Sequence, residues 1–585
     1  MSPSIHPACD PLSTLGPSLF LQILSQLPLE SLQTCYSVSK SWNELISSSP
    51  TTLYKPLAYS IGLEPPQLSK LEKIDKNTAK SSAWLNPRQD QSKPITSDTL
   101  HWKNVVKEQV IMQNNWKRGR AKGKWIYPRT NTAWRIKIDE EEGTIISTTR
   151  LIGVSVSDFE TSEPLFEYKE VGGYAHLEFV KGYAIFNSNN DRSFEVHITP
   201  SALSRLSTER RSKLPPSNQS ITHNKGYSFT NGKRYVPVPT ISNEIPPRGH
   251  LTYYKSLTPR TECFAFRARI DRQYTPEERL VFGTSSTEEA YIYDLQSESD
   301  QEMENFIYEP EDRGPPNYIE FDDNYLYICQ QFSVNVYSRN TKRKLLTFPP
   351  LFTAPFDAAS AIYTCYDTSK VTKKIKPKAK DDILVGEIEI QGKWIDDLGF
   401  DAVMMASGQG RIAGRKFSAI HYTSNDLFAI TRSGTIYALR NYHEIFSIQN
   451  PEERDKAVNA NSLAIVLREC LLQLSTYGEN VVITSSSSVF LLHTESLPKP
   501  PYNIGISQNP RMNIKLIKLL DIIQKGMVQC SCLQMDSKRI YIVYWALGEA
   551  EAGGHEDYEG NKILPPEQAI NAHGLCVKVW DFSVE

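Results

Sequence analysis

The first fifty residues carry large apolar side chains at helical spacing. Leu19, Ile23 and Leu27 follow one another at intervals of four, which predicts an amphipathic helix. A second short helix is expected after Pro28, and Ser39 is suited to cap a third. Three short helices cannot bury all of these side chains against one another. Either the rest of the chain or another protein therefore covers them.

The hydrophobic period changes further along the chain. Residues 64–99 are polar and contain four prolines, which indicates a linker. A helix is predicted over residues 100–116, where apolar side chains again recur at the helical period. From about Trp125 the pattern shifts to strict alternation, which is typical of β-strands.

The alternating region contains a recurring unit in which a short apolar strand, a polar turn and a second strand follow one another. Seven segments fit this unit: residues 143–159, 183–198, 279–295, 324–339, 425–440, 479–494, and 538–547 resuming at 574–582. Hairpins of one type at irregular intervals are typical of a β-propeller whose blades share a core and differ in their loops. We predict seven blades, with six or eight as alternatives. An assortment of hairpins in a β-sandwich or barrel is the competing interpretation.

Composition narrows the classes of protein. Of 585 residues, 39% are hydrophobic and 23% charged, and the net charge is −2; this argues against a general nucleic-acid or membrane binder, because both need a basic surplus. The nine cysteines are scattered and odd in number, which favours a reducing compartment. With no secretion signal and no long apolar run, we expect an intracellular protein in the cytoplasm, the nucleus or both.

The sequence contains no catalytic constellation. The glycines of GQGRIAG at 408–414 have the wrong spacing for a dinucleotide loop, and no HExxH motif occurs. Cys530 and Cys532 lie two residues apart without partners at metal-ligand spacing, so core packing is the better interpretation. We therefore expect a protein that is not an enzyme and needs no cofactor or metal.

The opening stretch LGPSLFLQILSQLPLESLQTCYSVSKSWNELI resembles the F-box. It departs from the usual pattern at Gly16, where proline is usual, and at Ser18, where Glu is common. Asn115–Gly119 (NWKRG) is similar to an element that precedes the propeller in F-box/WD-repeat proteins, and Trp580-Asp581 stands where the WD signature does. The residues that match the F-box pattern are Leu15, Leu19, Ile23, Leu24, Leu27, Pro28, Leu32, Val38, Ser39, Lys40 and Trp42.

This resemblance implies a multidomain chain: a small α-helical F-box domain (10–60), a linker with one helix (61–124), and an all-β, WD-like propeller (125–585). Long loop insertions are expected at 201–260, 297–316, 366–382 and 548–573. In the family, the Skp adaptor covers the leucine-rich helices and links them to a cullin–RING ligase. Burying six aliphatic side chains would contribute about 9–18 kcal/mol gross. The implied adaptor-binding residues are Leu15, Leu19, Ile23, Leu24, Leu27, Pro28, Leu32, Val38 and Trp42.

The resemblance also implies where a target protein binds. In WD-like propellers the turn between the second and third strands of a blade lies on the face that usually holds ligands, which places Arg150, Arg192 and Arg432 there. Arginine suits acidic or phosphorylated peptides, although ordinary solvated turn residues are the alternative. The implied function is a substrate receptor of a Skp–cullin–F-box ubiquitin ligase with unknown protein targets. The alternative is a non-catalytic propeller scaffold that binds partners without directing ubiquitination.

Overall fold

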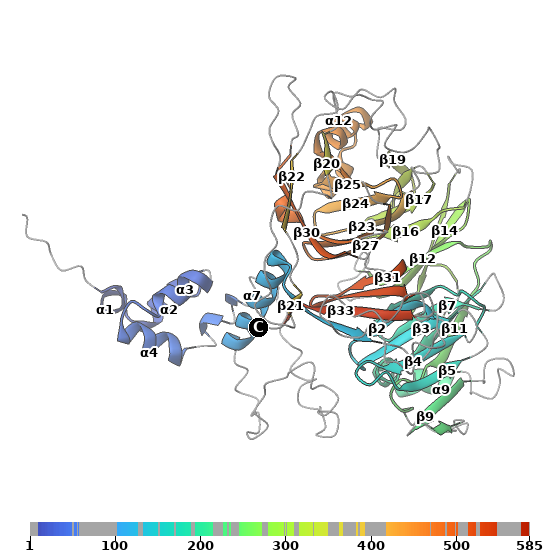
Figure 1. Cartoon of the computed structure of the whole chain (residues 1–585), viewed down its shortest axis with the longest axis horizontal. Helices are drawn as coiled ribbons and strands as arrows, with labels where there is room; N and C mark the ends of the chain where they lie inside the picture. The colour runs from blue at the N-terminus through green and yellow to red at the C-terminus, as the bar shows by residue number, and fades with distance from the viewer. Residues whose placement is uncertain are drawn as a thin grey trace, which may run out of the picture. The chain divides into compact units, whose positions relative to one another are not determined.

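In the computed structural model the chain forms two compact units, Met1–Lys117 with Ser583–Glu585, and Arg118–Phe582. The structure describes residues 102–126 and 575–583 without gaps. It also describes residues 10–57, 133–348 and 417–546, each with gaps, and three short strands within 362–391. Each unit has a core of its own, one helical and one built from strands (Figure 1).

The first unit is helical. Its described helices are α1 (Pro11–Leu15), α2 (Pro17–Leu24), α3 (Leu29–Cys35), α4 (Lys40–Ser48) and α7 (Trp102–Arg118). Gly16 joins α1 to α2 at a φ of 74°, a conformation that glycine adopts without strain. The side chain of Ser39 caps α4 by accepting a hydrogen bond from the Trp42 amide at 3.2 Å, as the sequence predicts.

Polar and aromatic contacts hold α1, α2 and α4 together. The Trp42 indole donates a hydrogen bond to Asp10 Oδ1 at 2.8 Å, and Asp10 also accepts from the Leu12 amide. The Trp42 ring packs edge-on against Phe20 with centroids 4.5 Å apart. The core of the unit consists of Phe20, Leu24, Leu29, Leu32, Ile46, Leu53, Tyr54, Leu57 and Val106. Val106 shows that α7 contributes to this helical core.

The described strands of the second unit form seven sheets with a common four-stranded plan. Blade 1 contains β2 (Ala133–Asp139), β3 (Thr144–Thr149), β4 (Val154–Asp158) and β5 (Pro164–Tyr168). Blade 2 contains β6 (Leu177–Val180), β7 (Tyr183–Asn187), β8 (Phe194–Ile198) and β11 (Thr252–Leu257). Blade 3 contains β12 (Ala265–Asp271), β13 (Arg279–Ser285), β14 (Glu289–Asp294) and β15 (Glu304–Ile307).

The remaining blades follow the same plan. Blade 4 contains β16 (Tyr318–Phe321), β17 (Tyr325–Cys329), β18 (Val334–Ser338) and β19 (Lys344–Phe348). Blade 5 contains β23 (Phe417–Tyr422), β24 (Asp426–Thr431), β25 (Thr435–Arg440) and β26 (Ser462–Leu467). Blade 6 contains β27 (Leu471–Tyr477), β28 (Asn480–Ser485), β29 (Ser488–His493) and β30 (Asn513–Asp521). Blade 7 contains β31 (Met527–Met535), β32 (Arg539–Ala546), β33 (Leu575–Asp581) and β1 (Ala121–Ile126).

The blades close into a ring. The innermost strands β2, β6, β12, β16, β23, β27 and β31 neighbour one another in that order, and β31 returns to β2. Closure depends on β1, which precedes blade 1 in sequence but pairs antiparallel with β33 from Lys122↔Asp581 to Ile126↔Val577. Both ends of the second unit therefore meet in blade 7, and the described strands form a seven-bladed β-propeller.

Insertions add strands and helices to this plan. Blade 1 continues through β9 (Gly226–Thr230) and β10 (Lys233–Tyr235), while β20 (Ile362–Tyr366), β21 (Asp382–Ile383) and β22 (Glu387–Gln391) extend blades 5, 7 and 6. The helices α8 (Pro200–Arg205) and α9 (Thr208–Lys213) follow β8. The helices α11 (Tyr442–Ser447) and α12 (Pro451–Asn461) follow β25, and the short 3₁₀ helix η5 (Thr494–Ser496) follows β29.

The predicted propeller and its seven blades are confirmed, and every predicted hairpin supplies the second and third strands of a blade. Two segments expected to be insertions also contain outer strands. Strand β11 lies within 201–260 and β15 within 297–316, and each forms the fourth strand of its blade. The predicted helix at 100–116 is present as α7, displaced by two residues.

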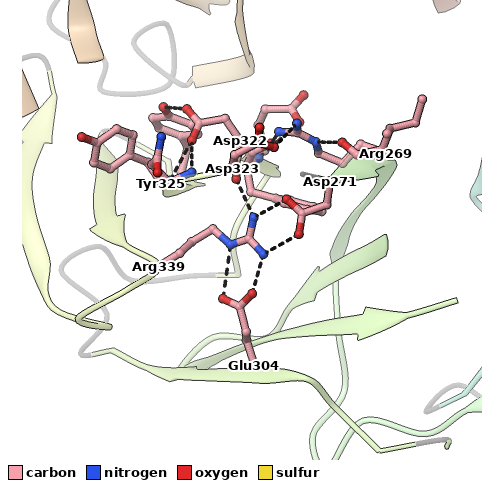
Figure 2. Close-up of polar contacts among 12 residues, drawn as sticks. Arg269, Asp271, Glu304, Asp322, Asp323, Tyr325 and Arg339 are labelled. Atoms are coloured by element: carbon pink, nitrogen blue, oxygen red, sulfur yellow. Dashed lines mark hydrogen bonds and ion pairs between the residues drawn. The ribbon is translucent and has the colours of Figure 1, made fainter. Parts of the chain in front are cut away.

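A buried arginine joins blades 3 and 4. Figure 2 shows the Arg339 guanidinium between Asp271 and Glu304, with its nitrogens 2.9 and 3.0 Å from the two Asp271 oxygens. The Arg339 side chain is fully buried and also donates to the Asp322 carbonyl at 2.7 Å. Asp322 in turn accepts hydrogen bonds from the hydroxyls of Tyr327 and Tyr442, which extends the network to α11. The acidic Glu304 is therefore an internal ion-pair partner of the propeller.

Replacing Arg339 by Met should lower the free energy of unfolding by about 3–5 kcal/mol, because Asp271 and Glu304 would stay buried without a counter-charge. Chemical denaturation of the full chain measures the effect. Arg339→Lys should lose less, since it keeps the charge. Adding Asp271→Asn and Glu304→Gln to the Met variant should recover part of the loss. An Arg339→Met variant as stable as wild type would show that this network does not hold the blades.

Candidate functional site

The first candidate surface is an apolar face of the helical unit. Leu15, Leu19 and Ile23 recur every four residues along α1 and α2, and their side chains are 40%, 47% and 45% exposed. Val38, between α3 and α4, is 56% exposed. We call these four residues the exposed apolar set. They remain accessible although the same helices have a complete core on their other side.

The other implied adaptor-binding residues are placed differently. Leu24 and Leu32 are 2% and 1% exposed and belong to the core of the helical unit. We therefore assign them to the folding of this unit, because a side chain buried in its own core offers no surface to a partner. Leu27 and Trp42 are half-buried against that core. Pro28 lies outside the described residues.

The turn arginines are only partly described. Arg432 lies exposed in the turn between β24 and β25 of blade 5, where the hairpin pattern places it. Arg150 and Arg192 lie outside the residues that the structure describes, as does the GQGRIAG segment. A cluster of the three arginines therefore stays a prediction.

The second candidate site lies on the innermost strands, which in a propeller surround a central channel. Charged side chains of successive innermost strands form a chain of ion pairs there. Lys137 on β2 lies 3.1 Å from Glu178 on β6, and Glu178 lies 3.9 Å from Arg267 on β12. Arg267 in turn lies 3.1 Å from Glu320 on β16, and His421 on β23 lies at the same distance from Glu320. Five adjacent blades are linked in this way. Sequence reasoning missed these residues, because their partners are distant in sequence.

The electrostatics of the channel follow from burial and pairing. Burial raises the pKa of Glu320, but the charge of Arg267 and the hydrogen bond from His421 outweigh it, so the pKa lies below its usual value. Burial lowers the pKa of His421. A neutral His421 donates from Nδ1 to Glu320 and accepts at Nε2 from the Tyr318 hydroxyl, which lies 2.9 Å away. The arrangement orients these side chains and leaves each described charge paired.

The described residues offer no metal centre: they contain no group of three or more His, Cys, Asp or Glu side chains placed to hold an ion. Cys530 and Cys532 are buried in β31, and burial raises the pKa of the Cys530 thiol to about 12. Among the helices that the structure describes, none combines the length and apolar character that crossing a membrane requires.

The partly buried His176 predicts a pH dependence of stability. Burial lowers the pKa of His176 to about 3, with Arg135 and Lys137 adding to the effect. Between this value and about 6.5 the unfolded chain binds the proton more tightly, so stability falls as the pH falls through that range. At pH 5 the loss from His176 alone is roughly 2 kcal/mol.

The variant His176→Gln should therefore lose about 2 kcal/mol less than wild type when denaturant unfolding is compared at pH 7 and pH 5. Comparing the two proteins cancels the contributions of other titrating groups. An identical pH dependence in both proteins would contradict the assignment of a neutral, partly buried His176.

Comparison with known protein families agrees with the resemblance of the helical unit to the F-box. The F-box-like family model matches residues 13–57. No curated protein matches the sequence. Solved structures similar to this chain include U3-55K (8% identity, TM-score 0.38, 78% of this chain and 98% of that one) and the WD40 repeats of RRP9 (8%, 0.39, 78% and 97%). A computationally designed protein, Ika8, is similar at 11% identity and a TM-score of 0.34, covering 78% of this chain and 97% of that one.

The chain combines two modules in a fixed order. An F-box-like segment occupies residues 13–57, and its helices keep an apolar face exposed. The strands that follow form seven blades closed by β1. This order of modules, an F-box-like segment followed by a seven-bladed propeller, is similar to that of F-box/WD-repeat proteins.

Proposed function

We propose that this protein is the substrate-recognition subunit of a Skp–cullin–F-box ubiquitin ligase. An F-box-like segment followed by a propeller fits a substrate receptor in general. In the proposed complex the helical unit binds the Skp adaptor, and through it the cullin, while the propeller binds a target protein. The alternative is a propeller scaffold that binds partners without directing ubiquitination.

The exposed apolar set carries the proposal. A small helical unit with a core of its own has no folding reason to hold Leu15, Leu19 and Ile23 exposed at its surface. Several exposed large apolar side chains on one small unit are typical of a protein–protein interface. The Skp adaptor is the partner that the F-box-like segment favours.

The energetics limit what the exposed set can do alone. About half of each side chain is already buried, so covering the rest contributes about 3–6 kcal/mol gross over the four residues. This is less than the gross value of about 9–18 kcal/mol expected for burying six aliphatic side chains. The adaptor cannot bury Leu24 and Leu32, because they already lie in the core of the helical unit. Association costs about 4–15 kcal/mol. The adaptor must therefore contact more than these four residues. We propose that it also forms polar contacts with the residues around the exposed apolar set.

The proposed contribution to catalysis is positional. A target held on the propeller and a ubiquitin carrier held through the cullin meet at a high effective concentration, which replaces a rare encounter in solution. Such a receptor needs two binding surfaces and a short connection between them. Only Gly119 and Arg120 separate α7 from β1, which is consistent with this requirement.

The decisive experiment is affinity capture with the variant Ile23→Asp. A charge at this exposed position should remove the Skp adaptor and cullin from the captured material, because a desolvated carboxylate is unfavourable in an apolar interface. Since Ile23 lies outside the core of the helical unit, the free energy of unfolding should change by less than about 0.5 kcal/mol. Mass spectrometry of the captured proteins measures the loss.

The matched control is Ile307→Asp, the same substitution at an exposed isoleucine of the propeller. It should leave capture of adaptor and cullin intact. Adaptor capture that survives Ile23→Asp would rule out the proposed docking face. Capture of cullin by wild type without accumulation of bound proteins after Ile23→Asp would favour the scaffold.

A further inference from the structure

One end of blade 3 presents two large apolar side chains to solvent. The pairs Ala265↔Ser285, Ser285↔Ala290 and Ala290↔Phe306 place that end of all four strands in one row. Phe264 directly precedes this row and donates its amide to the Ser285 carbonyl at 2.9 Å, while Ile307 directly follows Phe306. The Phe264 and Ile307 side chains are 39% and 76% exposed.

Strand spacing fixes the separation of these two side chains. They belong to the first and fourth strands of the blade, which lie about 14 Å apart at a spacing of about 4.8 Å per strand. An extended peptide rises about 3.3 Å per residue. A peptide that crosses the blade end and contacts both side chains therefore places its own apolar residues about four positions apart.

Carboxylates flank the apolar pair. Glu262 precedes Phe264 by two residues, and the Glu288 carbonyl accepts the Tyr308 amide at 2.8 Å beside Ile307. Both glutamates are exposed, and neither forms an ion pair with a residue that the structure describes. A third carboxylate, Glu289, accepts a hydrogen bond from the Tyr291 hydroxyl. We call Glu262, Phe264, Glu288 and Ile307 the blade 3 rim; its charge complements a basic partner.

The charged side chains of the innermost strands do not favour a phosphate. Lys137 and Arg267 already contact Glu178 and Glu320, and Arg269 lies 2.9 Å from Asp323. An incoming phosphate would have to break these ion pairs and meet their carboxylates. The rim itself adds negative charge, which repels a phosphorylated segment.

We propose that the blade 3 rim is the docking surface for the target protein. It binds an unphosphorylated, extended segment with two large apolar side chains about four residues apart and with lysine or arginine beside them. The apolar side chains contact Phe264 and Ile307, and the basic ones pair with Glu262 and Glu288. This assignment rests on the proposed receptor function, and it names the class of target.

The test selects peptides with the full chain as bait. A phage-displayed library of unphosphorylated peptides and a synthetic phosphoserine library are screened in parallel. The unphosphorylated library should yield sequences with the predicted spacing and basic flanks. Fluorescence anisotropy of a selected peptide should then show about tenfold weaker binding to the Glu262→Lys, Glu288→Lys variant and to Ile307→Asp.

A matched control keeps the result specific. Glu452 and Glu453 on α12 are exposed, and their replacement by Lys changes the net charge equally, so binding of the selected peptide should stay unchanged. Enrichment from the phosphoserine library alone, enrichment from neither library, or rim variants without effect overturns the proposal. Adaptor capture with Ile23→Asp is scored separately, so failure of the receptor function and failure of the rim are distinguishable.

Discussion

Closure of the ring by β1 is the constraint on which the propeller depends. Blade 7 takes three strands from the end of the unit and its fourth from the beginning, through the pairing of β1 with β33. Without β1 the last blade would expose the edge of β33, and the seven blades would be held only by their neighbours. Gly119 lies two residues before β1 and has a φ of 65°, and a Cβ there would lie 2.6 Å from Ile517 Cγ2. The glycine of the NWKRG element therefore has a structural reason: it lets the chain enter the closing strand.

The sequence predicts the propeller well where burial follows a local pattern. The second and third strands of each blade are covered on both faces by neighbouring blades, so they appear as apolar alternating hairpins; β13, β24 and β28 are nearly all buried. The innermost strands are harder to recognise, because charged residues such as Arg267 face the channel. The outer strand β15 lies in an acidic stretch, and Glu304 is buried only because Arg339, 35 residues away, neutralises it. No local pattern reveals such a partner.

The helical unit shows the same limit at the candidate site. Its helical period identifies the apolar residues but does not separate two apolar faces of one helix. In α2, Leu24 faces the unit's own core while Leu19 and Ile23 stay exposed. The difference is set by residues from other parts of the chain, such as Ile46, Leu53 and Val106, which pack with Leu24 in the core. The residues of the proposed adaptor-binding face can therefore be named only after the fold is known.

The charges of the innermost strands leave apolar contact as the basis of the proposed target recognition. In the channel, Lys137, Glu178, Arg267 and Glu320 alternate in sign and neutralise one another. Removing Glu178 would leave the partly buried charge of Lys137 without this partner, which costs more than the pair contributes. Such a chain is suited to fixing the blades in register and poorly suited to exchanging its partners for a ligand. In our proposal, recognition is left to the end of blade 3 where Phe264 and Ile307 are exposed, and the rim carboxylates Glu262 and Glu288 select among apolar segments by charge.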